Sequence, residues 1–340
     1  MLLSYDDNRI LLLYNTIRTL NKPWRETPMN KRVVIALGGN AILQDDPTAQ
    51  AQQKAVREIC ASVVGLVKSG YQVIITHGNG PQVGNLHLQQ RNSNSAQNPA
   101  LPLDSCVAMT QGSIGYWLQN ALGQALKETD SGRQVMSVIT QVEVEANDPA
   151  FDNPTKPIGP FMSEQEALDE KEMQGGHYME DAGRGWRKVV ASPRPVSIVE
   201  KIPIMHLLEK DVIVVCCGGG GIPVVQYEFS YSGIEAVIDK DLVAELLAVE
   251  LKADTLLILT GVDNVFVDYG KKTQKALFEI DTVSLRRYME AGQFPAGSML
   301  PKIQAAIRFS ESEKGRRTII TSIQRAGQID QGYCTQVIAP

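Results

Sequence analysis

A short apolar run that ends abruptly in glycine is the feature of this sequence that most restricts its fold. Residues 33–37 are all aliphatic, and Gly38, Gly39 and Asn40 follow at once. A run without polar alternation predicts a strand buried on both faces of a sheet. Glycines after such a strand leave room for a ligand beside bare backbone N–H groups, and open α/β sheets bind ligands at this edge. A plain tight turn has the same composition, so other features must decide.

A second run of this kind follows a predicted helix. Apolar residues recur at helical spacing over residues 48–69, and Gly70 supplies a stop. Residues 71–77 then predict a strand that ends in Gly78, Asn79 and Gly80. In a right-handed βαβ unit both glycine loops reach the same edge of the sheet. We therefore expect residues 38–40 and 78–80 to face each other across a cleft; two unrelated turns are the alternative.

The remaining chain keeps alternating between predicted strands and helices. An apolar run at 212–217 leads into four glycines that begin at Gly218, and a run at 255–260 leads into Gly261. Further strands are expected at 135–140, with 141–145 as an extension, at 318–322 and at 336–339, and helices at 104–127, 202–209, 242–252 and 301–313. This alternation predicts a three-layer α/β/α sandwich around a central, mostly parallel sheet.

Residues 147–195 differ in composition from the rest. They hold six prolines and few long apolar runs. Segments this long without regular patterning are usually functional, so we expect an inserted, protruding lid subdomain. Its charged tip includes Lys156, Arg184, Arg187 and Lys188, for which a solvated charged surface is the alternative interpretation.

Composition excludes several classes of protein. The 340 residues carry a net charge of −5, which argues against a general nucleic-acid-binding protein. No apolar run approaches the ~20 residues of a membrane span. The cysteines are five in number and show no metal-ligand spacing, which favours reduced thiols in a core and a cytoplasmic location.

The first 28 residues fit no targeting signal. Their apolar segment, residues 10–14, is preceded by Asp6, Asp7 and Arg9 and followed by no small-residue cleavage site. We expect residues 1–28 to be an extension outside the core, with Met29 opening the folded part. An added helix packed on the surface is the alternative.

Lysines beside aspartates and glycines favour phosphoryl transfer. Residues 239–241 read Asp-Lys-Asp before a predicted helix, and in residues 297–302 a small flexible turn precedes a helix that Pro301 opens and whose second residue is Lys302. Lysines neutralise the oxygens of a transferring phosphoryl group, and an aspartate can hold such lysines in place. The Asp-Lys-Asp triplet is also a common solvated helix start. The chain has neither a Gly-x-x-x-x-Gly-Lys-[Ser/Thr] loop nor Gly-x-Gly-x-x-Gly in its first βα turn, so the site is neither a P-loop nor a standard dinucleotide fold.

The four histidines form no metal-binding pattern. His77, at a strand end beside Gly78, either reaches the ligand or is a buried structural histidine.

Taken together, the segments resemble the carbamate kinases, which have the amino-acid-kinase fold. The resemblance rests on residues 34–41, 76–84, 154–159 and 236–241, is extended by 259–263 and 297–302, and covers residues 31–340. It implies one domain with a carbamate-binding N-lobe (31–210, with the lid at about 147–195) and a nucleotide-binding C-lobe (211–340). It also implies a homodimer, Mg²⁺ that accompanies ATP or ADP, and no metal held by protein side chains.

The implied reaction is reversible: ATP and carbamate give ADP and carbamoyl phosphate. In many members it makes ATP during arginine or purine-derivative breakdown. Carbamate is already an anion, so positioning and charge neutralisation suffice without a general base. A kinase of the same fold acting on another small carboxylate, a phosphate or a phosphonate is the alternative, and a non-catalytic sensor is a third possibility.

The resemblance also assigns roles to residues. Lys240 and Lys302 would hold the transferring phosphoryl group, Asp241 would position both, and Lys156 would swing in from the lid. Related kinases carry a lysine where this chain has Ala36, so the lid lysine is the substitute. The residues expected to line the transfer site and face carbamate are Gly38, Gly39, Asn40, Gly78, Asn79 and Gly80. Those expected to bind the nucleotide are Gly218, Gly219, Gly220, Thr260, Gly261, Val262, Gly297, Ser298 and Met299.

Overall fold

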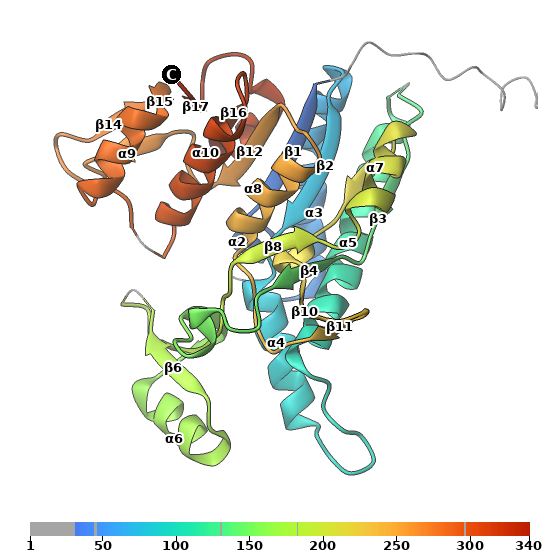
Figure 1. Ribbon diagram of the computed structural model, residues 1–340, viewed down its shortest axis with the longest axis vertical. Helices are drawn as coiled ribbons and strands as arrows, with labels where there is room; N and C mark the ends of the chain where they lie inside the picture. Colours follow the sequence, from blue (N-terminus) through green and yellow to red (C-terminus); the bar gives the residue numbers. More distant parts are fainter. Residues whose placement is uncertain (1–30, 44–45, 130, 182, 296) are drawn as a thin grey trace, which may run out of the picture. The chain divides into compact units, whose positions relative to one another are not determined.

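The structure is a computed structural model, and it describes residues 31–340 except 44–45, 130, 182 and 296 (Figure 1). The expected extension, residues 1–28, and the proposed start at Met29 lie outside the described residues. Among the described residues, no helix combines the length and the apolar character that crossing a membrane requires.

An eight-stranded sheet forms the centre of the domain. Its strand order is β15-β17-β16-β12-β1-β2-β9-β3, and all neighbours are parallel except β16 and β17. The strands are β1 (Arg32–Leu37), β2 (Gln72–His77), β3 (Val135–Ser137), β9 (Ile213–Val215), β12 (Thr255–Thr260), β15 (Glu279–Asp281), β16 (Arg317–Ser322) and β17 (Thr335–Ile338). The first apolar run is therefore a central strand, between β2 and β12, as its lack of polar residues predicted.

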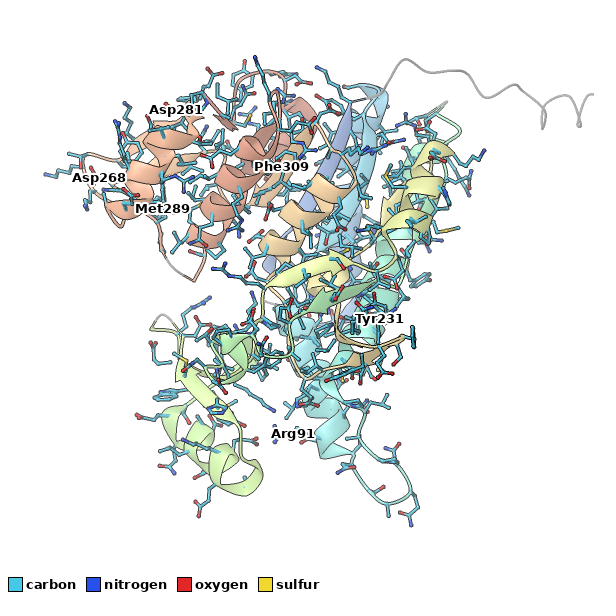
Figure 2. All side chains as sticks on the ribbon, in the orientation of Figure 1. Arg91, Tyr231, Asp268, Asp281, Met289 and Phe309 are labelled. Carbon is cyan, nitrogen blue, oxygen red and sulfur yellow. The ribbon has the colours of Figure 1, made fainter. Side chains whose placement is uncertain are left out.

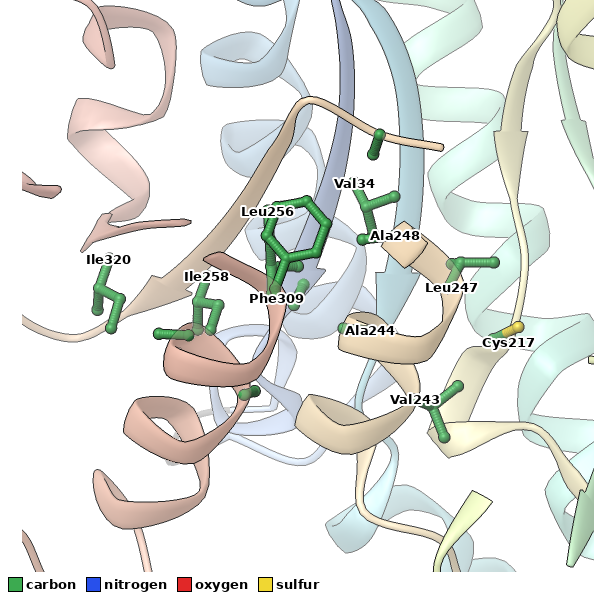
Figure 3. Close-up of a cluster of buried hydrophobic side chains, with 14 of the residues drawn as sticks. Val34, Cys217, Val243, Ala244, Leu247, Ala248, Leu256, Ile258, Phe309 and Ile320 are labelled. Atoms are coloured by element: carbon green, nitrogen blue, oxygen red, sulfur yellow. The ribbon is translucent and has the colours of Figure 1, made fainter. Parts of the chain in front are cut away.

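Helices cover both faces of this sheet. Val33, Ile35 and Leu37 point to the face covered by α3 (Ala49–Lys68) and α5 (Leu103–Lys127). Val34 and Ala36 point to the opposite face, where α8 (Lys240–Glu250) and α10 (Leu300–Ser312) pack. Figure 3 shows this second core, in which Phe309 of α10 lies against Leu256 and Ile258 of β12. The expected three-layer fold is confirmed.

A second sheet, of order β11-β10-β4-β8, corrects one expectation. Residues 141–145 were expected to extend the third strand, but β3 ends at Ser137 and β4 (Gln141–Val144) pairs with β10 (Ile222–Tyr227) and β8 (Pro195–Ile198). The chain leaves the main sheet at Thr140, whose N–H and carbonyl both bond to the side-chain amide of Gln111. The same carbonyl also accepts Ile222 N at 2.9 Å, at the point where the pairing of β4 with β10 begins. Strand β11 is Ser230–Gly233.

An inserted subdomain forms a third, antiparallel sheet of order β5-β7-β6. It comprises β5 (Lys156–Met162), α6 (Glu164–Gln174), β6 (His177–Glu180) and β7 (Trp186–Val190), and we call residues 156–190 the lid. Gly159 of the lid packs against α4 (Gly80–Asn92) so closely that a Cβ on Gly84 would overlap the Gly159 backbone. Arg91 of α4 pairs with Glu170 of α6 at 2.6 Å (Figure 2). The lobe boundaries drawn from the sequence stay predictions.

Shorter elements complete the fold. They are α2 (Gly39–Ile42), α7 (Lys201–Glu209), α9 (Thr282–Glu290), the hairpin β13 (Val265–Val267) with β14 (Lys275–Leu277), and the 3₁₀ turns η1 (Pro149–Phe151), η2 (Gly218–Gly220) and η3 (Ile323–Gln328).

Candidate active site

A cleft of about 770 Å³ opens where β1, β2 and β12 end. Its lining includes residues that follow each of these strands, such as Gly38, Gly78 and Gly261, and it extends to Lys156 of the lid. Ligands of open α/β sheets bind at this carboxyl edge. The expected position of the site is therefore also where the molecule has a large concavity.

The two glycine loops meet in this cleft. A Cβ placed on Gly39 would lie 3.3 Å from the carbonyl carbon of Gly78, and one placed on Gly78 would lie 2.8 Å from the nitrogen of Gly39. Side chains larger than hydrogen would therefore force the loops apart. The prediction that residues 38–40 and 78–80 face each other is confirmed, and the two loops are not unrelated turns. Asn40 lies in α2, which starts directly at the first loop.

Two lysines share one buried carboxylate at the centre of the cleft. Lys240 Nζ donates to Asp241 Oδ1 at 2.5 Å, and Lys302 Nζ donates to Asp241 Oδ2 at 3.0 Å. The Asp241 side chain is only 5% exposed. Burial acts to raise the pKa of Asp241, but the two lysine charges outweigh it and hold the pKa well below its usual range. The group is therefore a carboxylate at neutral pH.

The Asp-Lys-Asp triplet lies further into its helix than expected. The helix was expected over residues 242–252, but α8 begins at Lys240 because the side chain of Asp239 accepts a hydrogen bond from Asp241 N at 2.8 Å. This is an N-cap, which aspartate favours. Lys240 and Asp241 thus occupy the first turn of a helix packed on the sheet, and the alternative of a solvated helix start is excluded. Burial lowers the pKa of Lys240, and Asp241 opposes this shift.

The lid contributes a third lysine to the same cleft. Lys156, the first residue of β5, donates through Nζ to Asp239 Oδ2 at 2.5 Å. The four residues expected to form the clamp, Lys156, Lys240, Asp241 and Lys302, all line this one cleft. Lys156 thus belongs to the lining of the cleft, and its role in the clamp stays a prediction.

The other expected site residues divide into two groups. Most of them line the cleft directly, namely Gly38, Gly39, Gly78, Asn79, Gly80, Gly219, Thr260, Gly261, Val262, Gly297, Ser298 and Met299. Gly218 and Gly220 do not line it but belong to the buried turn η2, which packs against the second glycine loop. A Cβ on Gly219 would overlap the side chain of Asn79. The four-glycine turn thus supports the second glycine loop, residues 78–80. The nucleotide-binding role that was expected for this turn stays a prediction.

His77 is a structural residue. It is 1% exposed, and its Nδ1 lies 3.1 Å from the carbonyl oxygen of Gly78. Burial lowers its pKa to about 4, so the ring is neutral near pH 7. A Cβ on Gly218 would overlap this ring, and His77 is not among the residues that line the cleft.

Sequence reasoning missed part of the lining of the cleft. Aromatic and amide side chains from three separate segments belong to it, and they are Phe266, Tyr269, Gln293, Phe294 and Gln324. The rings of Phe266 and Tyr269 are 5.9 Å apart. Flat aromatic faces beside amides fit a heteroaromatic ring with hydrogen-bonding edges. No local pattern marked these residues, because they converge only in the folded chain.

Two further lining residues were also missed as site residues. Asp239 was read only as part of the Asp-Lys-Asp triplet, and Arg187 only as a charge of the lid. Arg187 is held by Asp181 at 3.2 Å and by the Phe161 ring, 5.1 Å from its guanidinium carbon. Among the described residues, no group of three or more His, Cys, Asp or Glu side chains could hold a metal ion.

Comparison with known proteins decides the family. The profile of the Amino acid kinase family matches residues 31–322. This chain belongs to that family. Within the amino acid kinase family, Carbamate kinase 1 of Enterococcus faecium is 54% identical over 301 residues, covering 88% of this chain and 96% of that protein. Carbamate kinase 2 of Enterococcus faecalis is 53% identical over 298 residues, with the same coverage.

Solved structures of this family agree. Carbamate kinase from Giardia lamblia bound to citric acid is 42% identical and superposes with a TM-score of 0.86, covering 92% of this chain and 99% of that one. The same enzyme bound to AMP-PNP gives a TM-score of 0.84 at 42% identity, with the same coverage. The resemblance inferred from the motifs is confirmed, as is the amino-acid-kinase fold.

Proposed function

We propose that this protein is a carbamate kinase, a phosphotransferase that converts ATP and carbamate reversibly into ADP and carbamoyl phosphate. The observation that carries the proposal is the convergence of Lys240, Lys302 and Lys156 on the point where the two glycine loops meet. Relatives about 50% identical over 88% of the chain bear this name. A protein that only bound its ligand would not need all three cations.

The chemistry follows from charge and position. A carbamate oxygen attacks the γ-phosphorus of ATP, a P–O bond forms, and the bond to the β–γ bridging oxygen breaks, which leaves ADP. Negative charge on the transferring group is neutralised by Lys240 and Lys302, while backbone N–H groups at the glycine loops contact its oxygens. Carbamate needs no deprotonation, so no side chain acts as general base.

The nucleotide would occupy the part of the cleft that sequence reasoning assigned to the C-lobe. Thr260, Gly261 and Val262 line the cleft after β12, and the aromatic and amide residues that also line it suit the adenine ring. Carbamate would lie on the side of Gly78 and Asn79, where Asn79 is fixed by its bond to Thr110 at 2.8 Å. The structure of the Giardia relative bound to AMP-PNP supports this ATP or ADP site.

Mg²⁺ would enter with the nucleotide. The cleft holds two carboxylates, Asp239 and Asp241, and both are paired with lysines. A divalent ion would therefore be held mainly by phosphate oxygens and water, as Mg²⁺ commonly is. The residues present fit such a nucleotide-borne ion better than a metal held by the protein itself.

We further propose a homodimer in the cytoplasm. Strand β3 is an edge of the central sheet, and Met136 on it and the nearby Ile139 are both nearly half exposed. Met109 and Tyr116, seven residues apart on α5, are exposed on one face of that helix. An edge strand beside an exposed apolar helix face fits a second copy of the chain. Analytical ultracentrifugation tests this, and a monomer at micromolar concentration would contradict it.

The activity is tested by coupling ATP formation to a reporter enzyme, with ADP, Mg²⁺ and carbamoyl phosphate at millimolar concentration. We expect turnover with carbamoyl phosphate and none with acetyl phosphate or inorganic phosphate. Turnover with acetyl phosphate instead would point to another carboxylate acceptor on the same fold. A folded protein without turnover on any of these compounds would refute the proposal.

A further inference from the structure

Asp239 joins two parts of the molecule through its two carboxylate oxygens. Its Oδ1 accepts the N–H of Asp241 at 2.8 Å and so caps α8. Its Oδ2 accepts the ammonium of Lys156, which belongs to the lid, at 2.5 Å. One side chain therefore fixes both the start of the helix that carries the central lysine and the lysine that comes from the lid.

This ion pair is only partly open to water. The side chains of Lys156 and Asp239 are 27% and 19% exposed. Burial acts to raise the pKa of Asp239, but the charges of Lys156 and Lys240 and the bond from Lys156 outweigh it and leave the pKa below its usual range. Asp239 is thus ionised at neutral pH and attracts the lid lysine.

The cap and the ion pair have different chemical requirements. An N-cap needs one acceptor oxygen, which asparagine or serine supplies as well as aspartate does. The ion pair with Lys156, by contrast, uses the negative charge, which Lys240 also feels without a hydrogen bond to Asp239. Lysine has a long flexible stem and no fixed hydrogen-bond geometry, so without an anionic partner its ammonium would sample many positions.

We propose that Asp239 is a positioning residue that docks Lys156 of the lid onto the first turn of α8. The docked ammonium is thereby placed beside Lys240 and Asp241, the next residues of that turn, at the point of phosphoryl transfer. When the phosphoryl group arrives, its oxygens compete with Asp239 for the same ammonium, and the lysine has only a short distance to move. This inference rests on the proposed function.

The variant that separates the two roles is Asp239→Asn. It keeps an acceptor for Asp241 N and removes the charge that holds Lys156. We expect kcat to fall by about 10-fold, because misplacing a catalytic group by an ångström has effects of this size or larger. KM for ADP should change by less than about 2-fold, since Asp239 holds a cation rather than the nucleotide. Asp239→Ser, a second capping residue without charge, replaces this variant if asparagine impairs folding.

Asp281→Asn is the matched control. Asp281 caps α9 by accepting Ser284 N at 2.8 Å and does not line the cleft (Figure 2). The same change of carboxylate to amide at this cap should leave kcat and KM unchanged. A loss of activity in the control equal to that of Asp239→Asn would reduce Asp239 to an ordinary cap and overturn the proposal.

A double variant tests whether Asp239 acts through Lys156. Asp239→Asn should cost nothing more in a Lys156→Ala background, because the group that it positions is already gone. If the two losses multiply instead, Asp239 acts independently of the lid lysine and the proposal is wrong. Wild-type kcat in Asp239→Asn would also refute it.

Hydrogen exchange separates this inference from the proposed function. Without any substrate, the backbone amides of Lys156 and Ile158 in β5 should exchange faster in Asp239→Asn than in the wild type and in Asp281→Asn. An inactive wild-type protein that still shows this difference would refute the carbamate kinase activity while keeping the docking contact. Equal exchange in all three proteins would refute the docking contact while leaving the activity to its own assay.

Discussion

The three lysines of the expected clamp are held in two different ways. Lys240 and Lys302 stand on α8 and α10, helices packed on the central sheet, and they share the buried carboxylate of Asp241. Lys156 stands on a strand of the lid and reaches the cleft through its pair with Asp239. The first pair is fixed by the core, whereas the position of the third lysine depends on how the lid sits.

This difference separates two kinds of energetic cost. Burying two lysines around one carboxylate costs desolvation, which is repaid only while all partners remain in place. Holding a lid lysine costs conformational freedom of the side chain and of the segment that carries it. We therefore expect changes in the fixed pair to affect chemistry and stability together, and changes in the lid lysine to affect chemistry alone.

The largest effect is expected from removing a lysine of the fixed pair. Lys240→Ala and Lys302→Ala should each lower kcat by at least ~100-fold, the scale seen when a contact to transition-state charge is lost. Each should also lower the midpoint of urea unfolding, because Asp241 keeps only one partner. Lys314→Ala, at an exposed position just after α10, is the matched control and should change neither quantity. Rates near wild type in the first two variants would remove these lysines from the mechanism.

Lys156→Ala is expected to have a smaller effect on rate and none on stability. Its kcat should fall by about 10- to 100-fold, because one charge contact is lost while the fixed pair remains. The affinity for ADP, measured by titration calorimetry, should stay within about 2-fold of wild type if nucleotide binding belongs to the C-lobe side. Unchanged turnover would return Lys156 to the role of a surface charge, and weakened ADP binding would make it a nucleotide ligand.

The same contrast explains what the sequence could predict. Strands buried on both faces leave a local signal, so residues 255–260 were expected as a strand and form β12 over the same residues. The long helix expected at 48–69 is observed at Ala49–Lys68. The two lysines of the fixed pair could also be predicted. Asp-Lys-Asp and the flexible turn before the proline-opened helix of Lys302 are short motifs, and the family resemblance supplied their roles.

Features that depend on distant contacts were not predictable from spacing. Lys156 and Asp239 are 83 residues apart, and nothing in either segment indicates that they pair. The aromatic and amide lining of the cleft likewise comes from separate segments, around Phe266, Phe294 and Gln324. The wrong assignment of residues 141–145 has the same origin, because β4 pairs with β10 and β8, which come from later parts of the chain.

The lid's contact with α4 provides a third test of the comparison. In Gly84→Ala the new methyl group would overlap the Gly159 backbone, which cannot move away without shifting the lid. We expect a several-fold loss of kcat through misplacement of Lys156, with a loss of stability of about 1–3 kcal/mol, the usual cost of overpacking. Gly123→Ala, in α5 with nothing within 4 Å of the new Cβ, is the matched control and should leave kcat unchanged. Wild-type kcat in Gly84→Ala would mean that lid position does not limit the reaction.

Two histidines extend the comparison to pH, with the smallest expected effect. His77 lies in the core, and burial lowers its pKa to about 4. His87 contacts Lys188 of the lid at 3.1 Å. Burial together with the charge of Lys188 lowers the pKa of His87 to about 4 as well. In the unfolded chain both have the ordinary histidine pKa of about 6.5, so between pH 6.5 and 4 the unfolded state binds more protons and stability falls as pH falls.

The two histidines should differ in which unfolding event they affect. For His77 the slope is up to about 1.4 kcal/mol per pH unit, and it should appear in global urea unfolding between pH 7 and 5. His77→Gln should lower that slope by the contribution of one proton, up to about 1.4 kcal/mol per pH unit. His87→Gln should instead mainly weaken the pH dependence of hydrogen exchange in the lid. If His77→Gln keeps the wild-type slope, other groups are its source. If His87→Gln changes global unfolding as much as His77→Gln does, the lid does not open separately from the core, and the distinction between a fixed pair and a lid-borne lysine fails.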